Sequence, residues 1–118
     1  MLSGNCLQVI TSVGGDAVLP CEVDPTAAHT EVAVEWTRPD LPADQYVYFQ
    51  RNGQEFDDTK SPSFEGRTSL FMDEVKNGNV SLKLCRVRRS DEGIYTCFLP
   101  ECQKAFTVQL IVGKRNYN

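Results

Sequence analysis

Two cysteines and one tryptophan constrain the fold of this chain most strongly. Cys21 and Cys97 lie far apart in the sequence, Trp36 follows the first of them, and Tyr95 begins a Tyr-Thr-Cys run that ends at the second. This spacing is typical of a sandwich of two β-sheets, in which a disulfide joins the sheets, the tryptophan packs against it and the tyrosine fixes a corner. We therefore predict a Cys21–Cys97 disulfide in a core that contains Trp36 and Tyr95.

The length of the chain favours a single domain. With 118 residues and 41% apolar content, the chain can bury one hydrophobic core. We expect residues 1–118 to form one domain, with tails at 1–5 and 114–118. Five cysteines indicate folding in an oxidising compartment, and hence a secreted or cell-surface protein. No secretory signal precedes Cys6 and no apolar run could span a bilayer, so we expect the ectodomain of a longer, membrane-anchored protein.

Short alternating segments separated by turn residues predict an all-β fold. The Asn52-Gly53 pair predicts a hairpin, because both turn positions favour positive φ. We expect about nine antiparallel strands in two sheets, at residues 8–12, 17–22, 32–37, 46–51, 54–57, 68–72, 80–85, 94–99 and 106–112. The extra hairpin between Trp36 and Gly66 favours a V-type over a C-type immunoglobulin β-sandwich.

Several motifs resemble those of immunoglobulin V-set domains. The general motifs are Glu-Gly-Arg-Thr at 65–68 and Ser-Asp-Glu-Gly-Ile-Tyr-Thr-Cys at 90–97. Further motifs are similar to the butyrophilin and myelin-oligodendrocyte-glycoprotein group, relatives of the T-cell costimulatory ligands: Val-Glu-Trp-Thr-Arg at 34–38, Tyr-Phe-Gln-Arg-Asn-Gly at 48–53 and Phe-Glu-Gly-Arg-Thr at 64–68. The resemblance runs from about Gln8 to Gly113, and it implies a structural ion pair between Arg67 and Asp91.

One departure concerns the last strand. Antigen-receptor variable domains carry a Phe-Gly-x-Gly bulge there, whereas residues 104–112 of this chain read Lys-Ala-Phe-Thr-Val-Gln-Leu-Ile-Val. The difference favours a germline-encoded receptor or ligand domain over an antibody or T-cell-receptor chain.

Strand alternation predicts which side chains can meet a partner. With Trp36 and Cys97 inward, their strand neighbours must face outward. We take Val47 and Phe49 as inward, which directs the residues between and beside them outward. The candidate partner-binding residues are Glu35, Thr37, Tyr46, Tyr48, Gln50, Phe98, Glu101 and Gln109. The aromatic members would anchor an interface, although covering the sheet against loops remains an alternative for the tyrosines.

Three cysteines remain after the main bridge. Cys6 and Cys102 are expected at the same end of the sandwich, so a second disulfide between them is geometrically possible; sequence alone does not fix the connectivity. Cys85 is expected to face outward on the opposite sheet, either as a lone thiol or as a site of intermolecular bridging.

Asn79-Val80-Ser81 matches the N-glycosylation pattern. We expect Asn79 at the start of a strand in the sheet opposite the candidate face, so that a glycan would leave that face free.

Charge and side-chain chemistry argue against several functions. A net charge of −4 disfavours binding to nucleic acid, which requires an excess of Lys and Arg. The single histidine, His29, lacks metal-ligand neighbours and is expected in a loop. The carboxylate pairs Asp57-Asp58 and Asp91-Glu92 lie on adjacent residues, whose side chains diverge. No glycine-rich phosphate loop precedes a helix. We expect neither catalysis nor a cofactor.

The resemblance implies an extracellular recognition domain of an immune-regulatory protein. Such a domain would bind a receptor on lymphocytes through the sheet of strands G, F, C and C′ and modulate T-cell responses. A homophilic or heterophilic adhesion domain, which would include a homodimer, and an innate immune receptor remain open as alternatives.

Overall fold

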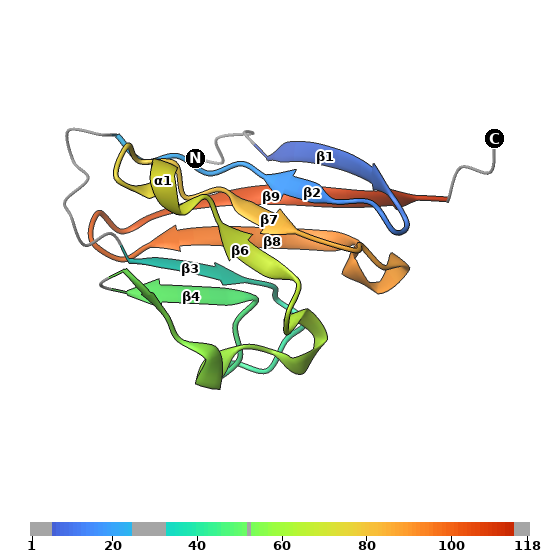
Figure 1. Cartoon of the computed structure of the whole chain (residues 1–118), viewed down its shortest axis with the longest axis horizontal. Helices are drawn as coiled ribbons and strands as arrows, with labels where there is room; N and C mark the ends of the chain where they lie inside the picture. Colours follow the sequence, from blue (N-terminus) through green and yellow to red (C-terminus); the bar gives the residue numbers. More distant parts are fainter. Residues whose placement is uncertain (1–5, 25–32, 52, 115–118) are drawn as a thin grey trace.

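The computed structural model describes residues 6–24, 33–51 and 53–114, which form two β-sheets (Figure 1). The six-stranded sheet contains, in spatial order, β1 (Leu7–Ser12), β9 (Lys104–Gly113), β8 (Gly93–Leu99), β3 (Val34–Thr37), β4 (Tyr48–Arg51) and β5 (Gln54–Glu55). The three-stranded sheet contains β2 (Ala17–Leu19), β7 (Leu82–Leu84) and β6 (Thr68–Leu70). These nine strands confirm the expected V-type sandwich.

Short helical turns connect the strands. They are α1 (Met72–Val75) and three 3₁₀ turns, η1 (Asp57–Thr59), η2 (Pro62–Phe64) and η3 (Arg89–Asp91). No helix in the described part of the chain is long and apolar enough to cross a membrane. His29, Asn52, the expected tail at 1–5 and residues 115–118 of the expected tail at 114–118 lie outside the described residues.

Several strand boundaries, and the direction of one strand pair, differ from the expectation. β2 ends at Leu19 because Pro20 has no N–H to donate to a ladder. The segment expected as a strand over 68–72 ends at Leu70, and Met72 instead begins α1. β1 pairs with β9 in parallel, from Leu7 opposite Val108 to Ser12 opposite Gly113, whereas we expected antiparallel strands only.

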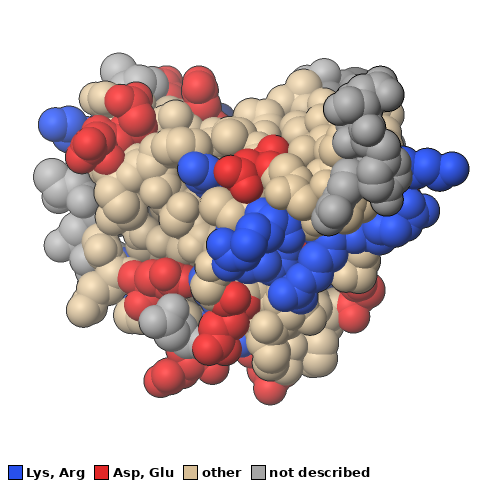
Figure 2. Space-filling model, turned by 45° about the vertical axis from the view of Figure 1, so that its right-hand side comes forward, with Lys and Arg blue, Asp and Glu red and all other residues tan. Residues whose placement is uncertain are grey.

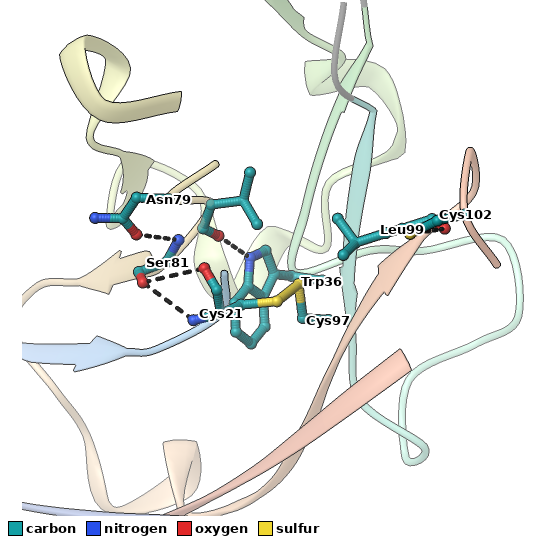
Figure 3. Close-up of a disulfide and its surroundings, with 8 residues drawn as sticks. Cys21, Trp36, Asn79, Ser81, Cys97, Leu99 and Cys102 are labelled. Atoms are coloured by element: carbon teal, nitrogen blue, oxygen red, sulfur yellow. Dashed lines mark hydrogen bonds between the residues drawn. A yellow bond between two sulfur atoms is a disulfide. The ribbon is translucent and has the colours of Figure 1, made fainter. Parts of the chain in front are cut away.

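The Cys21–Cys97 disulfide crosses the core and joins the two sheets, with its Cα atoms 6.6 Å apart. Figure 3 shows Trp36 beside this bridge. Its indole Nε1 donates a hydrogen bond to the Val80 carbonyl at 3.1 Å, so the buried polar edge of the ring is satisfied. The disulfide was predicted from spacing alone, and the structure confirms it.

An ion pair and a tyrosine fix one corner of the sandwich. Arg67 and Asp91 are both buried, with Nη1–Oδ2 at 2.7 Å and Nη2–Oδ1 at 2.9 Å. The Tyr95 hydroxyl donates to the Asp91 carbonyl and accepts from Arg38 Nη1. Burial raises the pKa of the Tyr95 phenol to about 12, although the Arg38 guanidinium acts in the opposite direction. This corner closes the end of the sandwich near η3.

Candidate recognition surface

The outer face of the six-stranded sheet carries a transverse row of aromatic and acidic side chains. β3 lies between β8 and β4, and Glu35 pairs with Phe98 on one side and with Phe49 on the other. Phe56 continues the row beyond β5, because its N–H donates to the Phe49 carbonyl at 2.9 Å. Residues opposite one another in neighbouring strands share a face of the sheet. We call Phe98, Glu35, Phe49 and Phe56 the Phe–Glu row.

Ring contacts consolidate one end of the Phe–Glu row. Tyr46 stacks on Phe49 with centroids 5.1 Å apart and an interplanar angle of 25°. Phe56 meets Phe49 edge to face, also at 5.1 Å, and the Arg51 guanidinium lies 5.5 Å from the centroid of the same ring. Phe49 is consequently only 9% exposed, whereas Tyr46, Phe56 and Phe98 are half-buried and can still contact a partner.

Glu35 is half-buried between two phenylalanines in this row. Within the described residues, no cation or hydrogen-bond donor contacts its carboxylate. A partly desolvated carboxylate is stabilised by a cation placed against it. The row therefore offers a partner two apolar contacts and one acceptor for a basic side chain.

Two of the expected contact residues are buried, which corrects our interpretation of β4. Tyr48 is 3% exposed and Gln50 is 1% exposed. Tyr48 lies opposite Trp36, its hydroxyl donates to Gln50 Oε1 at 2.8 Å, and Lys60 Nζ lies 5.0 Å from its ring centroid. Both side chains belong to the interior and are unavailable to a partner.

The error has a local cause at Val47. Simple alternation requires an unbroken strand, but Val47 lies in a bend before β4 and is fully buried. The bend shifts the alternation by one residue, so Val47 and Tyr48 both face inward. Phe49, which we expected inside, then takes the outer face.

The other expected contact residues lie on or beside the outer face. Glu35, Thr37, Tyr46, Phe98 and Gln109 are half-buried, and Glu101 is exposed in the turn between β8 and β9. Gln109 Oε1 accepts a hydrogen bond from Gln8 Nε2 at 3.1 Å, which ties the side chains of β9 and β1 together.

Phe49 and Phe56 were missed, although the sequence contained a signal for them. A two-residue Asn-Gly turn at 52–53 pairs residue 51 with 54 and 50 with 55, and hence places 49 opposite 56. The observed register of β4 and β5 has Arg51 opposite Gln54 and Gln50 opposite Glu55. The hairpin therefore predicts the Phe49–Phe56 contact without further information.

A second apolar patch lies on the outer face at β1, β8 and β9. Ile10 is 72% exposed and pairs with Ile111, while Ile94 is 38% exposed. We call Ile10, Ile94 and Ile111 the isoleucine patch. It is separate from the Phe–Glu row, because Thr96 lies between Ile94 and Phe98 on the same face of β8.

The remaining three cysteines are free thiols, so the structure does not contain a Cys6–Cys102 disulfide. Both cysteines lie toward the same end of β9, as expected, but at different levels: Cys6 precedes Leu7, which pairs with Val108, whereas Cys102 lies in the turn before Lys104. Several strand residues at about 3.3 Å each separate the two levels, more than the roughly 7 Å that a disulfide tolerates between Cα atoms. Instead, Cys102 packs near Leu99 at the edge of the core (Figure 3).

Two hollows lie away from the Phe–Glu row. One, of about 240 Å³, is lined by Leu7, Pro20, Cys21, Glu22, Phe106 and Thr107. The other, of about 480 Å³, is lined by Glu55, Asp58, Lys60, Glu65, Gly66 and Thr68. In the part of the chain that the structure describes, no group of three or more His, Cys, Asp or Glu residues could hold a metal ion.

Surface charge is mixed on the side of the molecule that faces the viewer in Figure 2. Lys and Arg side chains gather in a band there, with Asp and Glu side chains along its borders. Arg86 and Arg88 are held by the protein itself, since their guanidinium groups donate to the carbonyls of Gly66 and Ser63. These two guanidinium groups are therefore partly engaged in hydrogen bonds within the protein.

Comparison with known proteins places the chain in a family. The model of the immunoglobulin V-set domain matches residues 7–111. The chain is 41% identical to human myelin-oligodendrocyte glycoprotein over 86 residues, which cover 73% of this chain and 34% of that protein. It is 37% identical to human butyrophilin subfamily 1 member A1 over 94 residues, which cover 79% of this chain and 17% of that protein. The chain thus spans about a third or less of the length of these relatives.

A solved structure agrees with the fold. The human B7-H4 IgV-like domain superposes with a TM-score of 0.81 at 22% identity, over 92% of this chain and 94% of that one. The fold and its corner define a V-type immunoglobulin domain. The chain belongs to the immunoglobulin V-set family and is similar to butyrophilin and myelin-oligodendrocyte glycoprotein.

Proposed function

We propose that this chain is the extracellular recognition domain of a membrane-anchored, cell-surface immune-regulatory protein. It binds a protein receptor on lymphocytes and modulates T-cell responses through the outer face of its six-stranded sheet. The family assignment supports the class of function, and the Phe–Glu row is the observation that carries the choice of face. No step of this function requires catalysis or a cofactor.

The composition of the row suits reversible protein recognition. Half-buried aromatic rings supply large contact areas with little loss of side-chain entropy, and such residues dominate interface energetics. Phe98 and Phe56 lie on either side of Glu35 and Phe49 in the row. Thr37, Gln109 and Glu101 provide a polar border, as expected for an interface with an apolar centre and a wetter rim.

The test is staining of lymphocyte subsets with multimers of the domain. Phe98→Ala should weaken staining of the responding subset. Met72→Ala is the matched control, because Met72 is 52% exposed in α1, which follows β6 of the opposite sheet. Equal staining by the wild type and Phe98→Ala, with both proteins folded, would show that the row is not part of the binding site.

Homophilic adhesion is a second candidate, and the isoleucine patch favours it. An isoleucine as exposed as Ile10, next to Ile111 and Ile94, is the kind of apolar surface that another protein molecule covers. Under this alternative the wild type dimerises in analytical ultracentrifugation and Ile10→Ser is monomeric. A monomeric wild type at high concentration would exclude it.

A further inference from the structure

The approach to β7 contains the one Asn-x-Ser/Thr triplet of this chain, Asn79-Val80-Ser81. Its backbone is fixed on both sides. The Val23 N–H donates to the Gly78 carbonyl at 2.8 Å, and the Val80 N–H donates to the Cys21 carbonyl at 2.9 Å. Gly78 has φ +92, and a Cβ there would lie 2.2 Å from the Val23 oxygen, so glycine is required at this turn. Asn79 therefore has a defined direction.

The two ends of the Asn79 amide have different environments. Oδ1 accepts a hydrogen bond from the Ser81 N–H at 3.1 Å, which closes a local turn. Nδ2 has no hydrogen-bond partner in the described part of the chain, and Figure 3 shows it pointing away from Ser81 and from the disulfide. The residue is half-buried. An N-linked sugar replaces one hydrogen of Nδ2 and leaves Oδ1 as an acceptor, so the folded turn accommodates the linkage unchanged.

Ser81, the hydroxyl residue of the triplet, is committed to the core. It is 5% exposed; its Oγ accepts from the Cys21 N–H at 3.0 Å and lies 3.4 Å from the Cys21 carbonyl as a donor. A transferase that must contact this hydroxyl cannot reach it in the folded domain. The hydroxyl is accessible only before the segment that leads into β7 docks against Cys21.

We propose that Asn79 carries an N-linked glycan, added in the secretory pathway before this segment folds onto Cys21. The donor is a lipid-linked oligosaccharide diphosphate. The Nδ2–C1 bond forms, the C1–O bond to the diphosphate breaks, one amide proton is released and the lipid diphosphate leaves. The glycan projects from the layer of the three-stranded sheet, since Asn79 leads into its central strand β7. It therefore shields that layer and leaves the Phe–Glu row uncovered.

The first experiment is intact-mass measurement of the chain secreted from mammalian cells behind a signal peptide. The wild type should carry a mass increment that peptide-N-glycosidase removes. Asn79→Asp keeps the acceptor oxygen of the turn and should lack the increment, whereas Ser81→Thr keeps the hydroxyl and should retain it. Enzymatic removal of the glycan itself leaves Asp at 79, so the treated wild type is the folding control for Asn79→Asp. An unmodified wild type together with an unmodified Ser81→Thr would overturn the proposal.

A second experiment tests the order of events. Microsomes that contain the transferase are supplied either with the chain during translation or with the refolded wild-type domain. Modification only during translation is the expected result. Equal modification of the refolded domain would contradict the requirement for an undocked Ser81. Neither measurement involves a receptor, so both are independent of the proposed function.

Discussion

Arg67 and Asp91 hold each other through two parallel hydrogen bonds in the interior, at 2.7 and 2.9 Å. Asp91 Oδ2 also accepts from the Arg88 N–H at 2.7 Å, and Arg67 Nη2 donates to the Ser63 carbonyl. The pair therefore connects η3 with η2 and with the start of β6. It sets the distance between the two sheets at this corner, on which the Tyr95 contact also depends.

Removal of one partner should be costly because the other charge remains buried. We expect Asp91→Ala to lower the free energy of unfolding by about 3–5 kcal/mol. Urea denaturation of the wild type and the variant measures this difference. The control is Asp40→Ala, which removes the exposed carboxylate that pairs with Arg38 at the surface and should change stability by about 1 kcal/mol or less. A small effect at Asp91 would mean that the corner does not depend on the pair.

Tyr95 predicts a loss of stability at alkaline pH. Burial raises its folded pKa to about 12, above the ordinary value of 10.0. The folded state keeps the proton where the unfolded state loses it, so the contribution to stability is complete below about pH 10 and declines as the pH rises toward 12. The full loss is on the order of 3 kcal/mol. Denaturant midpoints at about pH 9 and pH 11 should fall more for the wild type than for Tyr95→Phe, which has no phenol to titrate. Parallel declines would contradict the shift.

Tyr48 and Phe98 should respond differently to truncation, because only one of them is in the core. We expect Tyr48→Ala to destabilise the domain by about 3–5 kcal/mol through the cavity it leaves beside Trp36. Phe98→Ala, on the outer face, should cost about 1 kcal/mol. Thermal unfolding of both variants makes the comparison. If Tyr48→Ala were as stable as the wild type, Tyr48 would have to be exposed and not part of the core.

Glu35 should contribute electrostatically to the proposed interface. Replacing it with Gln preserves its size and removes its charge, so we expect weaker binding to the responding lymphocytes and a smaller dependence of affinity on salt. Binding of wild type and Glu35→Gln, measured at low and high ionic strength, provides the test. Glu101→Gln controls for a carboxylate in the exposed turn. If salt weakens the binding of wild type and Glu35→Gln equally, Glu35 does not contact a cation of the partner.

The sequence was sufficient for the parts of the fold that depend on special residues. Cys21, Trp36 and Cys97 determine the sandwich because a disulfide and a buried indole have few acceptable arrangements. The predicted directions of the Phe49 and Tyr48 side chains were wrong, because a run of large apolar and aromatic residues gives no sign of the bend at Val47. Alternation is reliable only within a continuous strand. The environment of Cys102 could not be predicted from the sequence either, since it depends on how far β9 extends toward the turn.

The candidate surface was only partly predictable for a related reason. Glu35 and Phe98 follow from their neighbours Trp36 and Cys97, which are firmly inside. Phe56 lies after the short strand β5, where no core residue indicates the direction of its side chain. Its position follows from the register of the hairpin and not from strand alternation.

The central claim is that the Phe–Glu row binds the partner. The most direct measurement is a titration of the responding lymphocyte subset with wild type, Phe98→Ala and Met72→Ala, each confirmed as folded. We predict that Phe98→Ala binds roughly 5- to 30-fold more weakly, equivalent to about 1–2 kcal/mol, and that Met72→Ala binds like the wild type. Unchanged binding by Phe98→Ala with weakened binding by Met72→Ala would contradict the account and place recognition on the other side of the sandwich.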